Sequence, residues 1–417
     1  MADLEQLLGE LIVESSQLLA TSQSDQAVLI LQPHFQKFEK NPIYLQTLGE
    51  ALLENSDVQS AYEILSKACE IDNDASKGVE KFLYLGQIIG GEDGVKLLNV
   101  GVEKLLKQLD IIDNNNNNNS KNIENIEMDQ SLELLINAYG TLHKTRNYLI
   151  NKLNQALFAI IEIWMTDLCM QEDAEQRCEE TIQLALKLDP ENGETWSMLS
   201  SIRISQQRTD EAKQSVLKSW EMFYSKKSKL EELANESGNI QQQQQEEEEE
   251  EEEDINEAQL QYTELCQPLL TLAKYAIELG LFEIAINISS SVQDINEQSV
   301  ESFYLEGFAN YLNAKRIQNS IDEDKGYEIS NDFENYKLNY KIDKNDNSWN
   351  FINDSRIAFS NAYKLLQVDS ISDEIDSELR DTIPMLLEQV GGLLLKVKDD
   401  GNINESNWEN EIQMDDD

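Results

Sequence analysis

Residues 42–73 read PIYLQTLGEALLENSDVQSAYEILSKACEIDN, and this stretch decides the fold. Apolar and small residues recur in both halves at helical spacing: Leu45, Leu48, Gly49 and Leu52 in the first, and Ala61, Leu65 and Ala68 in the second. Such spacing predicts a helix in each half, and the polar residues 55–57 between them predict a turn. The stretch therefore predicts two antiparallel helices that cross closely at their small residues.

The same helix pair recurs along the chain. Further copies of the pattern occupy residues 11–31, 82–101, 162–190, 196–219 and 269–285, and residues 303–307 with 355–362. A helix pair repeated about every 34 residues is the signature of the tetratricopeptide repeat. The predicted fold class is all-α: a superhelical solenoid of about seven tetratricopeptide-type helix pairs, with residues 372–396 as a C-terminal capping helix that covers the last apolar face.

Low-complexity and polar segments interrupt this pattern. We predict a solenoid over residues 1–397, with disordered or irregular insertions at 113–128, 236–258 and 315–350, and a disordered acidic tail at 398–417. The first two insertions hold an asparagine run and a glutamine–glutamate run, which cannot bury apolar surface. The third has four aromatic residues that could dock on the solenoid: Tyr327, Phe333, Tyr336 and Tyr340.

The charge balance constrains the partners. The chain has 33 Lys and Arg against 80 Asp and Glu, a formal net charge of −47. Such a chain repels the phosphates of nucleic acids and anionic membrane surfaces, so we expect no nucleic-acid and no membrane partner. It attracts basic proteins over long range, although acidity can also serve solubility alone.

The residues that catalysis or metal binding would need are missing from the sequence. The four cysteines, Cys69, Cys169, Cys178 and Cys266, form no CxxC pair, and there are only two histidines. No glycine-rich phosphate loop and no nucleophile motif occurs. We therefore expect a protein that is not an enzyme, with no catalytic, metal or cofactor-binding residues. The cysteines are expected to be small core residues in a reducing compartment.

Targeting signals are not evident either. Residues 1–8 do not resemble a secretory signal, and the longest apolar stretch, 156–165, is too short to cross a bilayer. We expect a soluble intracellular protein.

The predicted binding surface is the concave face of the solenoid, which the first helices of the repeats line. The acidic and aromatic residues predicted to contact a basic partner there are Glu50, Glu54, Glu80, Asp167, Glu194, Glu278, Glu301, Tyr304 and Phe308. The alternative for each acid is a solvated charge without a partner.

Two stretches carry a more specific resemblance. Residues 161–212, IEIWMTDLCMQEDAEQRCEETIQLALKLDPENGETWSMLSSIRISQQRTDEA, and residues 377–392, SELRDTIPMLLEQVGG, resemble the fungal dedicated assembly chaperones of large-subunit ribosomal protein number four. The resemblance implies capture of that newly made basic protein and shielding of its long basic loop from aggregation and RNA. It also implies escort to nuclear pre-ribosomes, residence in cytoplasm and nucleus, and contact with a nuclear import receptor through the client.

Two other functions fit the same composition. The chain could be a generic tetratricopeptide adaptor in a multi-subunit assembly, or an acidic histone chaperone. A pull-down separates them, because it recovers one basic ribosomal protein, a set of assembly subunits, or core histones.

Overall fold

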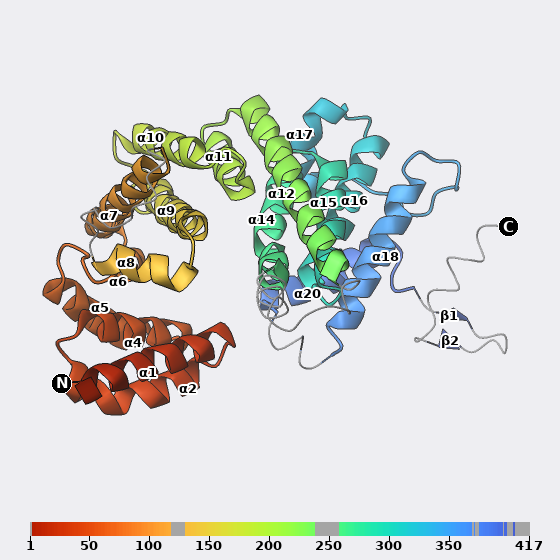
Figure 1. Cartoon of the computed structure of the whole chain (residues 1–417). Helices are drawn as coiled ribbons and strands as arrows, with labels where there is room; N and C mark the ends of the chain where they lie inside the picture. The colour runs from red at the N-terminus through yellow and green to blue at the C-terminus, as the bar shows by residue number, and fades with distance from the viewer. Residues whose placement is uncertain are drawn as a thin grey trace. The chain divides into compact units, whose positions relative to one another are not determined.

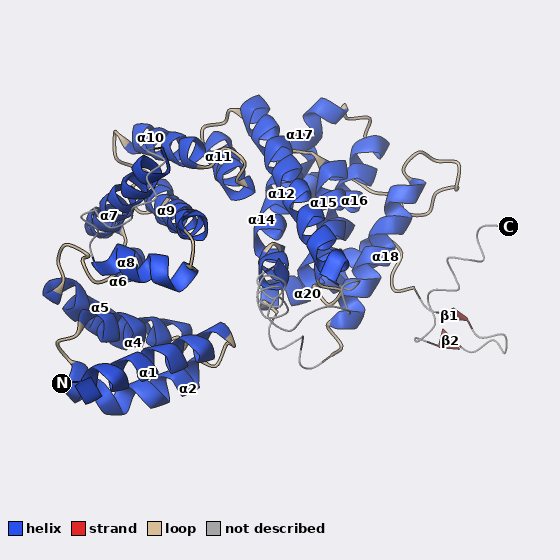
Figure 2. Ribbon diagram, in the orientation of Figure 1, coloured by secondary structure: helices blue, strands red, loops and turns tan. Residues whose placement is uncertain are grey.

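The computed structural model of the chain describes residues 2–117, 130–237, 258–368, 371, 375–394, 396–397 and 403–404. These residues form two compact units, Met1–Pro190 (unit 1) and Glu191–Asp417 (unit 2) (Figure 1). Nearly all of the described structure is helical (Figure 2). The exception is an antiparallel pairing of β1 (Lys396–Val397) with β2 (Ile403–Asn404).

Unit 1 contains four helix pairs: α1 with α2, α4 with α5, α6 with α7, and α9 with α10. Its elements are α1 (Ala2–Ala20), α2 (Ser24–Leu31), η1 (Gln32–His34), α3 (Phe35–Phe38), α4 (Pro42–Glu54), α5 (Val58–Ile71), α6 (Glu80–Ile89), α7 (Gly91–Asn117), α8 (Gln130–Tyr139), α9 (Leu142–Met165) and α10 (Ala174–Leu188). Successive pairs pack on each other through α2–α4, α5–α6 and α7–α9.

Unit 2 contains three helix pairs and a cap: α11 with α12, α14 with α15, α16 with α18, and then α20. Its helices are α11 (Gly193–Ser205), α12 (Thr209–Ser237), α14 (Cys266–Glu278), α15 (Phe282–Ile295), α16 (Val300–Gln318), η3 (Glu323–Lys325), α17 (Gly326–Asn331), η4 (Phe333–Asn335), α18 (Trp349–Leu365) and α20 (Ser377–Gln389). The prediction of an all-α fold of about seven tetratricopeptide-type pairs with a C-terminal capping helix is confirmed.

The pair α4–α5 shows why the sequence folds this way. The side chain of Asn41 accepts hydrogen bonds from the backbone N–H groups of Ile43 and Tyr44, and Asp57 accepts one from Ser60 at the start of α5. These caps satisfy N–H groups that the helices leave free. A methyl group placed on Gly49 would lie 2.5 Å from Cδ2 of Leu65, so a larger residue here would force the Leu65 side chain to move.

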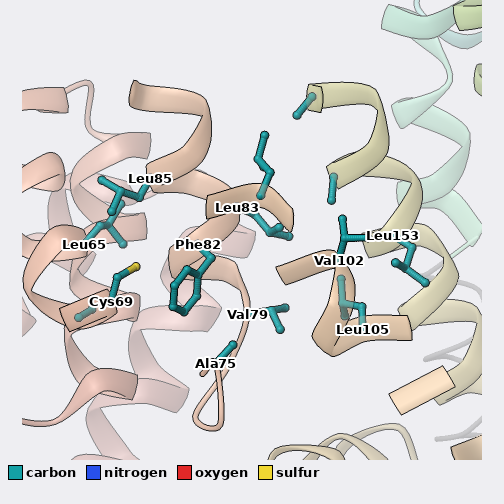
Figure 3. Close-up of a cluster of buried hydrophobic side chains, with 14 of the residues drawn as sticks. Leu65, Cys69, Ala75, Val79, Phe82, Leu83, Leu85, Val102, Leu105 and Leu153 are labelled. Carbon is teal, nitrogen blue, oxygen red and sulfur yellow. The ribbon is translucent and has the colours of Figure 1, made fainter. Parts of the chain in front are cut away.

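Buried side chains join successive pairs of unit 1 into one core. In unit 1, Leu65 of α5, Phe82 of α6, Leu105 of α7 and Leu153 of α9 are all nearly or fully buried, and they lie in one apolar cluster (Figure 3). Each helix pair alone would leave one apolar face in water, so stacking is what stabilises the array.

The pair α16–α18 confirms a long-range prediction. A methyl group on Gly307 of α16 would lie 2.7 Å from the ring of Phe359 of α18, and Ser355 donates a hydrogen bond to the Gly307 carbonyl over 2.8 Å. The residues between the two helices form an irregular ordered segment that contains η3, α17 and η4.

The other two predicted insertions are described only at their edges. Helix α7 continues to Asn117 and so includes the first residues of the 113–128 segment. Residues 118–129 and 238–257, with the glutamine–glutamate run, and most of the 398–417 tail lie outside the described residues.

One prediction about the cysteines is wrong. Cys69 and Cys178 are buried, but Cys266 is half-buried and Cys169 is exposed, because Cys169 lies in the turn that follows α9. Within the described ranges, no helix is long and apolar enough to span a bilayer. No group of three or more metal-ligating side chains occurs within those same ranges.

Candidate functional site

Carboxylates and tyrosines of α4, α6 and α9 meet on one face of unit 1. Tyr84 donates a hydrogen bond to Glu50 over 2.8 Å, and Tyr148 donates one to Glu80 over 2.7 Å. Gln46 also donates to Glu80, over 3.0 Å. We call Glu50, Glu54, Glu80, Tyr84 and Tyr148 the glutamate–tyrosine face.

Burial and mutual repulsion disfavour the ionised form of the carboxylates on this face. Burial raises the pKa of Glu50, and nearby Glu80 and Glu54 raise it further, whereas the Tyr84 hydrogen bond and Lys152 oppose the increase. Burial and these carboxylates also raise the pKa of the Tyr84 hydroxyl. A cation that entered the face would relieve this repulsion, because an opposite charge favours the ionised carboxylate.

A cavity of 270 Å³ adjoins the face. Glu80 and Tyr148 contribute polar groups to its wall, and Gln108 lies beside Ser131, to which it donates over 2.8 Å. The rest of the wall combines the apolar residues Ile43, Val79, Leu105, Leu134, Leu135 and Ala138 with Gln46, Ser76, Lys77 and Gly78. A pocket with an apolar wall and carboxylate at its edge suits a long side chain with a charged end.

Asp167, also predicted to contact a partner, has a structural hydrogen bond. Its carboxylate accepts a hydrogen bond of 2.8 Å from the backbone N–H of Gly91, at the first residue of α7. A carboxylate at a helix N-terminus is stabilised there by the helix dipole. The structure therefore places Asp167 at a helix end, apart from the hydrogen-bonded group of Glu50 and Glu80.

In unit 2, the predicted residues lie on the first helices of three pairs. Glu194 is in the first turn of α11. Loss of solvent around its carboxylate and the charge of Glu264 raise its pKa, while Lys226 opposes that increase. Burial likewise raises the pKa of Glu278, the last residue of α14. Glu301 of α16 pairs with Lys274 of α14 over 2.6 Å, so its charge is already partly compensated.

A hollow of 640 Å³ lies on this face of unit 2, and α14, α16 and α20 line it; we call it the acidic hollow. Tyr304 and Glu301 of α16 face Glu378 of α20 across it. Burial raises the pKa of Tyr304, and the charges of Glu378 and Glu301 add to this effect. Leu270, Val300 and Leu379 supply apolar wall, so the hollow combines negative charge with apolar surface.

Aromatic rings continue from this hollow along α16. Tyr304 stacks on Phe308 at 5.7 Å between ring centroids, and Phe308 meets Phe333 edge-on at 5.3 Å. Phe333 comes from the 315–350 segment, and its carbonyl accepts a hydrogen bond of 2.7 Å from Lys315. Burial lowers the pKa of Lys315 to about 8, although Glu334 opposes this change. Phe333 therefore covers one side of Phe308, a predicted contact residue.

Several residues of these surfaces were not predicted from the sequence. Tyr84 follows Glu80 by one helical turn, a spacing that could have indicated it. Tyr148 and Glu378 are far along the chain from their partners, so no local pattern marks them. Glu306 of α16 was also missed; burial raises its pKa, while Gln293 donates a hydrogen bond to it over 2.7 Å.

Comparison with protein families addresses the C-terminal part of unit 2. Residues 298–404 match the ACL4 C-terminal domain family. The matched region includes α16, α18 and α20, and therefore Glu301 and Tyr304 of the acidic hollow and the neighbouring Phe308.

Curated relatives agree with this ACL4 match. A Schizosaccharomyces pombe protein described as "Probable assembly chaperone of rpl4" is 32% identical over 213 residues, which are 50% of this chain and 54% of that protein. An Emericella nidulans protein with the same description is 27% identical over 226 residues, 51% of this chain and 49% of that protein. The chain thus spans about half the length of the curated relatives it matches. The resemblance predicted from the sequence is confirmed.

A solved structure supports the fold. The chain is similar to "Assembly Chaperone of RpL4 (Acl4) (Residues 1-338)", with a TM-score of 0.54 and 23% identity, over 75% of this chain and 99% of that one. At this identity the likeness concerns the fold, and it agrees with the helix pairs described above.

Proposed function

We propose that this protein is a dedicated chaperone that captures a newly made basic large-subunit ribosomal protein, number four, and shields its long basic loop from aggregation and RNA. The descriptions of both curated relatives as assembly chaperones of rpl4 support this client. The net charge of −47 supports a basic partner, because opposite charge accelerates encounter and suppresses acidic competitors.

The observation that carries the proposal is the glutamate–tyrosine face of unit 1. Carboxylates held close together and partly buried repel one another, as the raised pKa of Glu50 indicates. An arginine or lysine of the client removes this repulsion and can also lie over the ring of Tyr84 or Tyr148. Binding energy then comes from interactions that the folded face has already organised.

The acidic hollow of unit 2 would act in the same way on a second part of the client. Glu301 and Glu378 attract cations, while Leu270 and Leu379 accept the aliphatic stems of long basic side chains. A client loop that bound both surfaces at once would bind more tightly than it binds either surface alone, because the second binding event would be intramolecular.

The proposal extends to the path of the client in the cell. The chaperone would bind its client in the cytoplasm, accompany it into the nucleus with a nuclear import receptor bound through the client, and release it at pre-ribosomes. This role requires binding and release only, without a catalytic step.

The test is a calorimetric titration of the full chain with purified ribosomal protein number four and, separately, with core histones. Neutralising the face with Glu50→Gln and Glu80→Gln should weaken client binding by about 2 kcal/mol or more if client cations become buried there. The matched control is Glu63→Gln with Glu70→Gln, which neutralises two exposed acids on the second helix α5.

Equal losses in the two double variants would refute the role of the face. Equal affinity for histones and for the ribosomal protein would favour the histone chaperone. A pull-down that recovers a set of assembly subunits in place of one ribosomal protein would favour the adaptor.

A further inference from the structure

Residues 336–344, YKLNYKIDK, form an extended run on unit 2 with alternating environments. Tyr336, Leu338 and Ile342 are half-buried against the core of unit 2. Gln318 fixes the backbone at Asn339, because its amide accepts from the N–H over 2.8 Å and donates to the carbonyl over 2.9 Å. The other side chains of the run are exposed, and we call Lys337, Tyr340 and Lys341 the lysine strip.

The lysine strip carries positive charge that its surroundings do not neutralise. The run contains three lysines and one acid, Asp343, whose carboxylate accepts a hydrogen bond of 2.9 Å from the backbone N–H of Asn345. In the part of the chain that the structure describes, no carboxylate lies within ion-pair distance of Lys337 or Lys341. Another exposed lysine of unit 2 does have such a partner, since Lys274 lies 2.6 Å from Glu301.

The chain leaves unit 2 beside this strip. A methyl group on Gly391, just after α20, would lie 3.3 Å from Cδ2 of Tyr340. Arg356 anchors the next residue by donating to the Gly392 carbonyl over 2.7 Å. Beyond that exit, residues 405–417 contain six acids and no Lys or Arg. We call residues 405–417 the acidic end segment.

We propose that the acidic end segment docks in cis on the lysine strip. Ten residues lie between Leu394 and Glu405, so the segment begins at most about 40 Å along the chain from its anchored exit. A short tether gives an effective concentration in the millimolar range, at which weak ion pairs are sufficient for docking. Trp408 adds an aromatic ring that can pack on Tyr340 or over Lys341.

Docking in cis would cover the lysine strip and would prevent it from attracting other acidic molecules. This inference does not depend on the identity of any client, because both surfaces belong to the same chain.

The experiment is zero-length carbodiimide cross-linking of the full chain alone, with peptides identified by mass spectrometry. The reagent joins a lysine to a carboxylate only when the two are in contact. Trypsin leaves residues 399–417 as one peptide, because no Lys or Arg follows Lys398. We expect this peptide on Lys337 and Lys341, severalfold more often than on the exposed control lysines Lys37 and Lys40 of unit 1. The yield should fall severalfold at 1 M salt, where the screening length drops to about 3 Å.

The double variant Lys337→Glu and Lys341→Glu makes the test independent of lysine reactivity. It should abolish salt-sensitive protection of the end segment from a glutamate-specific protease, whereas Lys37→Glu with Lys40→Glu should leave it unchanged. Several outcomes would overturn the proposal: equal cross-linking at the control lysines, cross-links from the lysine strip to the glutamate run 246–253, or cross-links only between isotopically distinct copies of the chain.

Discussion

A buried ion pair positions the first turn of α6, and its removal gives a sharp test of how unit 1 is held together. The Lys81 ammonium lies 2.7 Å from the Asp72 carboxylate, and the two side chains are 0% and 3% exposed. Lys81 also donates to the Gly78 carbonyl. Lys81 is adjacent to Glu80, so the pair connects the end of α5 to the start of the glutamate–tyrosine face.

The substitution Lys81→Met would remove the cation but keep the apolar stem. Asp72 would then be a buried carboxylate that keeps hydrogen bonds from the Ser76 N–H and hydroxyl and the Lys77 N–H but lacks its cation. Breaking one partner of a buried pair costs about 3–5 kcal/mol. Because Asp72→Asn with Lys81→Met removes both charges, the double variant should recover most of this loss.

Urea denaturation followed by circular dichroism measures the effect. The matched control is Lys96→Met, because Lys96 and Asp93 form a pair of the same 2.7 Å length whose side chains are 70% and 79% exposed. This control should leave the unfolding midpoint unchanged. If the single and double variants at the buried pair lose equal stability, the ion pair is not coupled, and the reasoning is refuted.

Three other predictions concern stability and reactivity. Burial alone would raise the pKa of Asp72, but hydrogen bonds from Lys81, Ser76 and Lys77 lower it to about 2. The stability that the Asp72 carboxylate contributes should therefore be complete above its unfolded pKa and disappear as pH falls toward 2. If the unmodified chain and Asp72→Asn lose stability equally over this pH range, the prediction is contradicted. Phe333→Ala should loosen the 315–350 segment, because the Phe333 ring packs against Phe308. Tryptic cleavage at Lys325 and Lys337 should become faster, while the helical circular dichroism signal stays unchanged. Unchanged cleavage would show that the Phe333 ring does not anchor the segment. Cys169 should react with maleimide much faster than Cys69, because Cys169 is exposed whereas burial raises the pKa of Cys69 to about 12; equal rates would contradict the described burial.

The sequence by itself determined the helix pairs. Leu45, Leu48 and Leu65 recur at helical spacing, and Gly49 marks the place where two helices touch, so local periodicity was enough to predict α4 and α5. Periodicity also identified α16 and α18 as partners across a long insertion, because Ser355, Phe359 and Ala362 repeat the pattern of a second helix, and in the structure Phe359 packs against Gly307.

Only the tertiary structure decided which charges act together. Glu50 and Glu80 share a face because α4 and α6 stack, and Tyr148 reaches Glu80 from 68 residues away. Asp167 fitted the same repeat pattern as Glu50, yet its carboxylate receives the N–H of Gly91, 76 residues distant. Helical spacing specifies which side of a helix a residue occupies, whereas the partner across that side depends on how helices far apart in sequence pack, and this information is not local.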